Sequence, residues 1–355
     1  MIRVLLLGAG NIGVAIADLL FTSGDYHVTV GDCDESRLKD MPEQVDTRRV
    51  DVADGGSLRD ALRGMDVVVS ACPFYLNVPI AEAARELSVH YFDLTEDVET
   101  TLRIREIAAD ADTVFMPQCG LAPGFISVVA HDLANRFDSL RRVHMRVGAI
   151  PMFSSNALKY NLTWSTAGLI NEYCNPCEVI YDGELRQVLP LEGYEQFSLD
   201  GVTYEAFNTS GGLGTLCETL EGKVANLNYK TIRYPGHCEL IKFLCRDLRL
   251  CERRELFQDV LEQAVPATVQ DVVLIFVTVS GEKGGKLVQE SYSKKVNHGK
   301  VGLVDLAAIQ ITTAAGLCAA VDLQRDGKLP ERGFVRQEDV SLVDFLDNRF
   351  GKLYD

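Results

Sequence analysis

Glycines placed directly after an apolar run constrain this chain more than any other feature. The stretch VLLLGAGNIGVAIADLL joins a strand pattern to a helix pattern through glycines in the spacing G-x-G-x-x-G: Gly8, Gly10 and Gly13. In this context the first glycine makes a tight turn, the second admits a pyrophosphate to the backbone, and the third lets the helix pack on the strand. The alternative is an ordinary turn between strand and helix. We expect a dinucleotide site whose phosphates face the free helix amides at Asn11 and Ile12.

An acidic residue supports this interpretation. Asp32 ends the second strand pattern, about 20 residues beyond Gly13, where a carboxylate can accept both ribose hydroxyls of an adenosine. The same negative charge repels the 2′-phosphate of NADP. We therefore expect NAD as the cofactor, with NADP as the alternative because the nearby Arg37 offsets some of the repulsion.

Up to about residue 120, strand-like runs alternate with helix-like segments. The expected strands are residues 3–7, 27–31, 48–52, 66–70, 90–94 and 113–116. Helical periodicity covers residues 12–20, 57–63 with Ser57 as its cap, and 98–109. Parallel strands need such crossover helices, so the order predicts an α/β fold with a Rossmann-like, doubly wound parallel sheet.

Open parallel sheets bind ligands at the carboxyl ends of their strands, and this rule indicates further site residues. We expect the adenine beside Asp51 and Val52. The nicotinamide and its ribose should follow the later strand ends, at Ala71, Cys72, Pro73, Leu94, Thr95, Gly120 and Leu121. Asp93 stands out among these positions, because a carboxylate just past a buried strand is costly unless something pairs with it.

The pattern changes after about residue 140. Residues 141–150 and 271–283 are strong strand candidates, residues 183–191 are a weaker one, and helices are expected near 165–172 and 236–245. A long apolar helix then begins at residue 306 and ends near Gly327 and Pro330. The change predicts a second, mixed α+β domain.

Charge and cysteine content exclude several classes of protein. The formal net charge is −16, whereas nucleic acids and anionic membranes select clustered Lys and Arg, so neither is an expected partner. The apolar stretch 306–321 is too short to span a bilayer. Ten cysteines are scattered along the chain, which favours reduced thiols in the cytoplasm and no disulfide. The motif CNPC, with Cys174 and Cys177, lacks a second ligand pair, so we expect no metal.

Separated motifs carry a family likeness. They are LLGAGNIGVAIADLL, the Ala-Cys-Pro turn at 71–73, YFDLTED at 91–97, CGLAPGF at 119–125, KYNLTWSTAGLINEYCNPCEVIYDG at 159–183 and IRYPGHCELIKFL at 232–244. In this order they resemble the saccharopine dehydrogenase family over nearly the whole chain. Within that family the likeness is greatest to the L-lysine 6-dehydrogenases, while saccharopine reductases and carboxynorspermidine dehydrogenases share the same frame.

The resemblance implies two domains and an oxidoreductase. An NAD(P)-binding Rossmann domain would comprise residues 1–124 and 306–355, and a domain for substrate binding and homodimer formation would comprise residues 125–305. The implied reaction oxidises an amine carbon of a small amine or amino acid: L-lysine would give 2-aminoadipate 6-semialdehyde and ammonia. Saccharopine or carboxynorspermidine dehydrogenase activity is the alternative within enzymes. A dinucleotide-sensing regulator without catalysis is the alternative of another class.

Oxidation of such an amine requires a base, because a lysine amine with a pKa of about 10.4 carries a proton at neutral pH. Asp93 is the first candidate and His237 the second, although a histidine at a helix start is often simply held by the backbone. Lys159 and Arg233 are candidates to hold the substrate carboxylate, or else are ordinary cations at a surface or strand edge. Trp164, the only tryptophan, would shape the pocket or fill a core.

Overall fold

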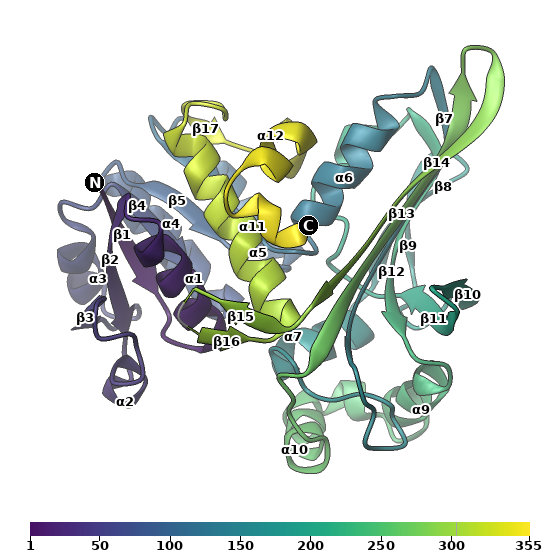
Figure 1. Cartoon of the computed structure of the whole chain (residues 1–355), viewed down its shortest axis with the longest axis horizontal. Coiled ribbons are helices and arrows are strands. Elements are labelled where there is room, and N and C mark those ends of the chain that lie inside the picture. Colours follow the sequence, from purple (N-terminus) through teal and green to yellow (C-terminus); the bar gives the residue numbers. More distant parts are fainter. Residues whose placement is uncertain (303) are drawn as a thin grey trace. The chain divides into compact units, whose positions relative to one another are not determined.

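The computed structural model describes residues 1–302 and 304–355 and divides into two compact units. Unit 1 comprises Met1–Val128, Lys300–Leu306 and Gln310–Asp355. Unit 2 comprises Val129–Gly299 and Ala307–Ile309. Figure 1 shows the helices and strands of both units, coloured along the chain.

Unit 1 is built on a seven-stranded sheet in which neighbouring strands are parallel. Its strands are β1 (Ile2–Leu7), β2 (Tyr26–Asp32), β3 (Asp46–Arg49), β4 (Val67–Ser70), β5 (His90–Asp93), β6 (Val114–Met116) and β17 (Gly333–Phe334). The spatial order is β17-β6-β5-β4-β1-β2-β3, so the chain order reverses beside β1. This confirms the expected doubly wound, Rossmann-like sheet, whose switch point lies at the carboxyl end of β1.

Helices connect the strands of unit 1 or follow its last strand, β17. They are α1 (Asn11–Thr22), α2 (Glu35–Leu38), α3 (Gly55–Leu62), α4 (Asn77–Glu86), α5 (Val98–Ala108) and α12 (Leu342–Asp347), with short turns η1 (Phe74–Leu76), η4 (Gln337–Asp339) and η5 (Gly351–Tyr354). Two further helices contain residues of both units: α6 (Phe125–Ala134) and α11 (Ala308–Arg325). The apolar helix expected from residue 306 is thus present as α11.

The cap of α3 differs from the expected one. Asp54 is the N-cap, and its side chain accepts a hydrogen bond from the Gly56 amide at 2.9 Å. Ser57 lies inside the helix, and its hydroxyl accepts instead from the Asp51 amide at 3.1 Å. An aspartate that precedes the serine therefore fills the capping position.

The third strand also lies slightly earlier than expected, at Asp46–Arg49 rather than at residues 48–52. All residues of β3 are exposed, whereas the more apolar Val50 and Val52, which suggested the later position, follow the strand. Because the edge strand β3 buries none of its side chains, its sequence carries little of the apolar pattern that predicts a strand.

Unit 2 contains an eight-stranded mixed sheet. Its strands are β7 (Ser139–Pro151), β8 (Cys177–Tyr181), β9 (Glu184–Val188), β10 (Glu195–Leu199), β11 (Val202–Asn208), β12 (Val224–Arg233), β13 (Asp271–Lys283) and β14 (Lys286–Asn297). The order is β10-β11-β12-β7-β13-β14, with β8 paired to β12 and β9 to β8. The pair β12 and β7 is parallel and the other pairs are antiparallel, which confirms a mixed second fold. A separate two-stranded sheet is formed by β15 (Gly299–Val301) and β16 (Val304–Leu306).

All the helices and helical turns of unit 2 named here except α8 contribute to an apolar cluster, called the α7 core from here on. The helices and turns are α7 (Thr166–Cys174), α8 (Leu216–Leu220), α9 (His237–Lys242), the π-helical turn η2 (Phe243–Asp247), the turn η3 (Leu250–Glu252) and α10 (Arg254–Ala264). The α7 core comprises Tyr160, Leu169, Ile170, Tyr173, Leu191, Phe207, Cys238, Ile241, Cys245, Leu250, Phe257, Leu261 and Val265. The helix expected at 236–245 is divided, because the π-helical turn follows α9.

A disulfide joins Cys174, at the end of α7, to Cys251 in η3. The expectation that the chain has no disulfide is therefore wrong. The two cysteines are 77 residues apart in the sequence, so their spacing does not reveal the pair, whereas the fold places their Cα atoms 5.5 Å apart. Cys177, the other cysteine of CNPC, is a buried free thiol on β8.

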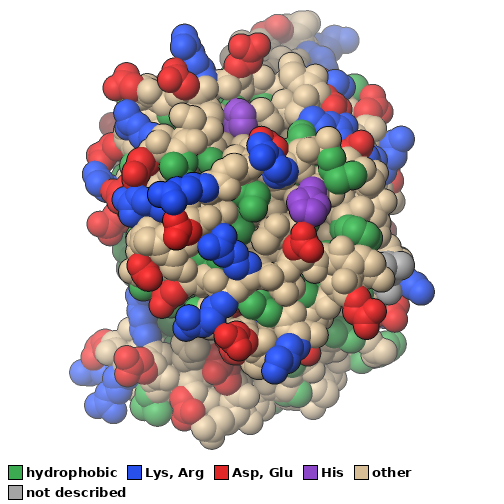
Figure 2. Space-filling view, turned by 90° about the vertical axis from the view of Figure 1, so that its left-hand side faces the viewer, with side chains coloured by type: hydrophobic (Ala, Val, Ile, Leu, Met, Phe, Trp, Pro, Cys, Tyr) green, Lys and Arg blue, Asp and Glu red, His purple; other side chains and the backbone are tan. Residues whose placement is uncertain are grey.

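Charges of both signs are mixed on the face drawn in Figure 2. Lys and Arg side chains are interspersed there with Asp and Glu, and hydrophobic side chains lie in small separate groups.

Across residues 1–302 and 304–355, no helix combines the length and apolar character that a membrane span needs.

Candidate functional site

The glycine loop between β1 and α1 has a geometry that side chains would prevent. A Cβ on Gly13 would lie 1.9 Å from the carbonyl oxygen of Gly8. Gly8 itself has a φ of +104°, and a Cβ there would lie 2.8 Å from the carbonyl oxygen of Ala71, just after β4. A Cβ on Gly10 would meet no atom of the described chain within 4 Å. Gly8 and Gly13 thus close the turn, while Gly10 leaves its outer side open.

The N-terminus of α1 offers amide donors at this open side. Gly10 is the N-cap, so it has no side chain that could accept from the first turn. Asn11 is exposed and Ile12 is half-buried. Free amides and the helix dipole favour a negative group at such a position, and a pyrophosphate is such a group.

Asp32 lies directly beside the glycine loop. Its Oδ2 accepts a hydrogen bond from the Ala9 amide at 2.8 Å, and its Oδ1 accepts one from the Asp34 amide at 2.9 Å. The residue is half-buried, and a carboxylate with one donor on each oxygen has acceptor capacity left for a ligand. The fold therefore holds together the loop and the acidic residue that are expected to bind one dinucleotide.

The residues expected beside the adenine lie next to Asp32. Val50 donates its amide to the carbonyl oxygen of Asp32 at 3.0 Å, which brings the following Asp51 and Val52 to the carboxyl ends of β2 and β3. Both residues are half-buried. Their contact with an adenine stays a prediction.

The Ala-Cys-Pro turn lies on the other side of the glycine loop. Ala71 donates its amide to the carbonyl oxygen of Leu7 at 2.8 Å, so the turn continues β4 beside the end of β1. Cys72 is half-buried and Pro73 is exposed. Burial raises the pKa of the Cys72 thiol to about 12, so the turn borders the loop without adding a charge.

Asp93 ends β5 and is fully buried. Its Oδ2 accepts from the Tyr91 hydroxyl at 2.6 Å and from the Asn77 side-chain amide at 3.3 Å, and its Oδ1 accepts from the backbone amides of Thr95 and Gln118 at 2.9 and 3.0 Å. Burial raises the pKa of Asp93 to about 6, while these donors favour the ionised form. Since four donors occupy both oxygens, the carboxylate is suited to holding the strand ends in place, and its role as base stays a prediction.

The loop after β6 packs tightly against the same region. A Cβ on Gly120 would lie 3.5 Å from a methyl carbon of Leu94, and a Cβ on Gly124 would lie 2.0 Å from the carbonyl oxygen of Gly120. Thr95 and Leu121 are both buried. The structure thus gathers at this edge of unit 1 the residues that are expected to border the nicotinamide.

Glu96 is a further candidate that sequence reasoning missed. It follows Asp93, Leu94 and Thr95 at the carboxyl end of β5. Desolvation of its carboxyl group raises its pKa to about 7, with smaller contributions from the negative charges of Asp97 and Asp93. A carboxyl group with a pKa near neutrality can exchange protons at working pH, as a general base must. In the sequence, the signal that points to Glu96 is its position in the acidic motif YFDLTED.

His237 begins α9 and is buried, with both ring nitrogens in hydrogen bonds. Its Nδ1 lies 2.8 Å from the carbonyl oxygen of Leu158, and its Nε2 lies 2.9 Å from the Tyr173 hydroxyl. With Nδ1–H donating to the carbonyl, Nε2 accepts from the Tyr173 hydroxyl. Burial and the positive charge of Arg233 lower the pKa of His237 to about 3, so the ring is neutral. Its role as base stays a prediction, since neither nitrogen is free in this conformation.

We expect His237 to make folding stability fall in acid. Its pKa is about 3 in the folded protein and 6.5 in an ordinary environment, so the unfolded chain binds the proton first. The contribution of the neutral ring is complete above about pH 6.5 and falls by up to about 1.4 kcal/mol per pH unit below it. Urea unfolding of the wild type and of His237→Asn, at about pH 7 and about pH 5, measures this contribution of His237 to the free energy of unfolding. An equal loss of stability in both proteins would contradict the assignment.

Arg233, at the end of β12, is also buried and partnered. Its Nε donates to the Tyr173 hydroxyl oxygen at 3.0 Å, one terminal nitrogen donates to the Thr231 hydroxyl at 2.7 Å, and the other lies 3.7 Å from a Glu172 oxygen. The guanidinium lies 4.9 Å from the centre of the Tyr160 ring. These contacts satisfy its charge within unit 2, and its contact with a substrate carboxylate stays a prediction.

Lys159 and Trp164 lie on the segment that precedes α7. Lys159 is exposed, and its Nζ donates to the Pro235 carbonyl oxygen at 2.8 Å. Trp164 is half-buried against the α7 core. Pro235 belongs to the turn between Arg233 and His237, so the structure brings the predicted residues of unit 2 into one neighbourhood.

Comparison with known families covers almost the whole chain. Residues 4–116 match the family model described as the saccharopine dehydrogenase NADP binding domain, and residues 120–352 match the saccharopine dehydrogenase C-terminal domain. The chain belongs to the saccharopine dehydrogenase family. The resemblance carried by the separated motifs is confirmed at this level, as is an NAD(P)-binding first domain.

Curated relatives from the saccharopine dehydrogenase family are distant and longer. A saccharopine dehydrogenase [NADP(+), L-glutamate-forming] of Pyricularia oryzae is 24% identical over 74% of this chain and 60% of its own length. The mitochondrial alpha-aminoadipic semialdehyde synthase of Rattus norvegicus is 20% identical over 81% of this chain. The chain spans 32% of the length of that synthase.

A solved structure of a saccharopine dehydrogenase shares the fold. The apo saccharopine dehydrogenase (L-Glu forming) from Saccharomyces cerevisiae matches with a TM-score of 0.81 and 18% identity, covering 98% of this chain and 97% of the yeast chain. At this identity the likeness establishes the fold alone.

Proposed function

We propose that this chain is an NAD(P)-dependent dehydrogenase that oxidises a carbon–nitrogen bond of an amino acid. The observation that supports it most is the closed glycine loop with Asp32 bonded to its Ala9 amide. Asp93, a buried polar residue at the end of β5, lies at the carboxyl ends of the parallel strands, where such a sheet binds its ligand. Bound NAD(P) would supply the hydride acceptor, and the protein would supply binding, orientation and proton transfer.

L-Lysine is the substrate that we propose first, with 2-aminoadipate 6-semialdehyde and ammonia as products. The net charge of −16 favours the approach of a small molecule with ammonium groups over that of a polycarboxylate. Lys159 is the exposed cation that we propose as partner of the substrate carboxylate. Saccharopine is the alternative, because the fungal relative is named a saccharopine dehydrogenase, and carboxynorspermidine follows on motif likeness.

We propose Glu96 for proton transfer, from its partly exposed position just after the carboxyl end of β5 together with its raised pKa, and a positioning role for Asp93. The substrate ammonium must lose a proton before its lone pair can expel hydride from the neighbouring carbon. The carboxyl group of Glu96 has a pKa of about 7 and can accept that proton at neutral pH, whereas both oxygens of Asp93 already accept hydrogen bonds. The resulting imine carbon is then attacked by water, which releases ammonia and the aldehyde.

Asp32 should select NAD over NADP. Its carboxylate, bonded to the Ala9 amide, would face the adenosine ribose and repel a 2′-phosphate. We expect the wild type to bind NADH at least about tenfold more tightly than NADPH, and Asp32→Ser to reverse or remove this preference. Asp40→Ser changes an exposed acid that lies after β2. It is the matched control and should keep the preference for NADH. Tighter binding of NADPH by the wild type would contradict this preference.

A substrate panel tests the proposed activity. The purified chain is mixed with NAD or NADP and with lysine, saccharopine or carboxynorspermidine, and absorbance of the reduced nicotinamide is followed. We expect turnover with lysine and NAD. Turnover with saccharopine alone would move the assignment to the alternative substrate. Saturable coenzyme binding without turnover of any amine would favour the dinucleotide-sensing regulator.

A further inference from the structure

Three cysteine sulfurs of unit 2 meet at the end of α7. The Sγ atoms of Cys174, Cys245 and Cys251 all lie within 4.8 Å of one another. Cys174 and Cys251 form the disulfide, while Cys245, in the π-helical turn η2, is a buried free thiol. A free thiol this close to a disulfide provides the three sulfurs that thiol–disulfide exchange requires.

We propose that Cys174, Cys245 and Cys251 form a redox-responsive thiol–disulfide site, with Cys245 as the exchanging thiol and small dithiols and disulfides as its reactants. In the exchange, Cys245 loses its proton and its sulfur bonds to Cys251, while the Cys174–Cys251 bond breaks and Cys174 takes up a proton. The exchange consumes no oxidant. Full reduction uses a dithiol, whose two thiols become one disulfide as Cys174 and Cys251 become thiols, and a small disulfide reverses it.

Small reactants can reach this site more easily than they can reach the inner thiol. Cys174 and Cys251 are half-buried at the edge of the α7 core, whereas Cys245 is part of that core. Burial raises the pKa of the Cys245 thiol to about 11, against a smaller opposite effect of Arg246. Internal exchange should therefore be slow at neutral pH and accelerate by about tenfold per pH unit, because the thiolate is the attacking species.

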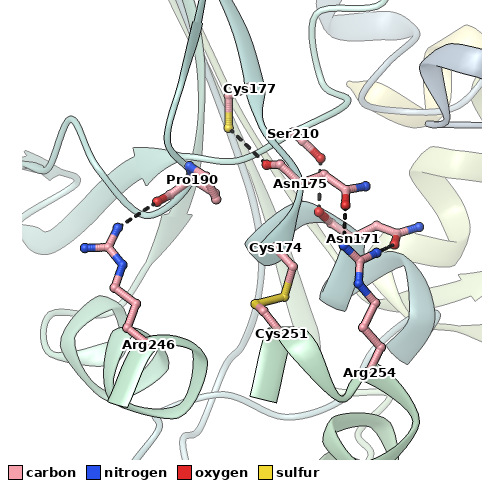
Figure 3. Close-up of a disulfide and its surroundings, with 9 residues drawn as sticks. All are labelled: Asn171, Cys174, Asn175, Cys177, Pro190, Ser210, Arg246, Cys251 and Arg254. Atoms are coloured by element: carbon pink, nitrogen blue, oxygen red, sulfur yellow. Dashed lines mark hydrogen bonds between the residues drawn. A yellow bond between two sulfur atoms is a disulfide. The ribbon is translucent and has the colours of Figure 1, made fainter. Parts of the chain in front are cut away.

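The disulfide is the covalent tether on the last turn of α7, and hydrogen bonds add to it. One hydrogen-bonding partner is Arg254, which donates to Asn171 Oδ1 at 2.7 Å and to Asn175 Oδ1 at 2.6 Å. Figure 3 shows the disulfide and the Arg254 side chain reaching this same turn. Opening the disulfide removes the covalent link, and the turn is then held by hydrogen bonds, including those from Arg254 and the one that the Ser210 hydroxyl donates to the Asn171 carbonyl oxygen at 3.1 Å.

The tethered turn also carries a central side chain of unit 2. Tyr173 directly precedes Cys174, and its hydroxyl lies 2.9 Å from His237 Nε2 and 3.0 Å from Arg233 Nε. A change in the redox state of the cysteines thus acts on the helix that positions Tyr173. The site links thiol chemistry to the cluster in which the candidate substrate residues of unit 2 lie.

Mapping the disulfides of the full chain tests the pairing. Samples equilibrated with reduced and oxidised glutathione are alkylated and analysed by peptide mass spectrometry. We expect the wild type to contain Cys174–Cys251 together with a fraction in which Cys245 is paired to Cys251, and Cys174→Ser to form Cys245–Cys251. Cys177→Ser removes the other cysteine of CNPC and, as the matched control, should give the wild-type pattern.

Two results of this mapping would overturn the proposal. One is a Cys174→Ser protein with native circular dichroism in which Cys245 and Cys251 stay fully alkylated under oxidising conditions. The other needs no variant: a wild type in which Cys245 never enters a disulfide at any glutathione ratio, including at alkaline pH. Neither result depends on whether the chain turns over an amine.

Amide hydrogen exchange tests the effect on α7. Reduction of the wild type with dithiothreitol should accelerate exchange in peptides covering residues 166–174 by roughly tenfold, because a cross-link that restrains local opening is removed. Peptides covering β1 in unit 1 are the internal control and should not change. Equal exchange of α7 in the oxidised and reduced proteins would show that the disulfide does not restrain it.

Discussion

Gly13→Ala should abolish dinucleotide binding and destabilise the fold by about 2–4 kcal/mol. The added Cβ would lie 1.9 Å from the carbonyl oxygen of Gly8, which is backbone and cannot turn aside. Either α1 or the loop must therefore move, and both form the expected pyrophosphate site. Urea unfolding measures the loss of stability, and titration with NADH followed by nicotinamide fluorescence measures binding. A stable Gly13→Ala protein that binds NADH as the wild type does would contradict this account of the loop.

Gly10→Ala separates the role of the loop in binding from its role in folding. A Cβ there meets no atom of the described chain within 4 Å, so we expect stability within about 0.5 kcal/mol of the wild type. The same methyl group stands where a pyrophosphate must approach, so affinity for NADH should fall at least about tenfold. Gly299→Ala, also without close neighbours within 4 Å, is the matched control and should change neither quantity.

Glu96→Gln should lower kcat for amine oxidation by about 100-fold to 1,000-fold, if the proposed function holds, because the amide cannot accept the substrate proton. The wild-type kcat/KM should rise with pH through about 7, as Glu96 ionises, and the variant should lose this rise. Steady-state kinetics between about pH 5 and 9 measure both effects. A variant with unchanged kcat and an unchanged profile would remove Glu96 from the mechanism.

Asp93→Asn provides the contrast with Glu96→Gln. The new NH2 group cannot accept the hydrogen bonds that one carboxylate oxygen receives, so we expect a loss of about 1–3 kcal/mol of stability. Glu96→Gln should be at least as stable as the wild type at about pH 7, because burial of the ionised carboxyl group costs stability and the neutral amide avoids that cost. A stable but inactive Asp93→Asn, together with an active Glu96→Gln, would return the role of base to Asp93.

The Rossmann-like half of the fold could be predicted because its signals are local. Continuous apolar runs such as β1 and β4 are buried on both faces of a parallel sheet, and the glycines report a steric requirement directly. Asp32 follows from its distance to the loop along a regular strand–helix–strand unit. These features need no knowledge of contacts between distant segments.

The rest of the candidate site depends on such contacts. The pairing of Cys174 with Cys251 spans 77 residues, and the pKa of Glu96 is set by burial that no spacing reveals. Strands such as β14 alternate exposed and half-buried side chains, which leaves a weak apolar pattern. His237 and Arg233 were recognisable as unusual residues, but their common partner Tyr173 emerges from the fold.

Titration calorimetry of the wild type with NADH, with NADPH as comparison, tests the central claim most directly. The account predicts saturable heat with one site per chain and a preference for NADH, weakened in Gly10→Ala and kept in Gly299→Ala. The absence of saturable heat with either dinucleotide, from a protein that unfolds cooperatively, would contradict it.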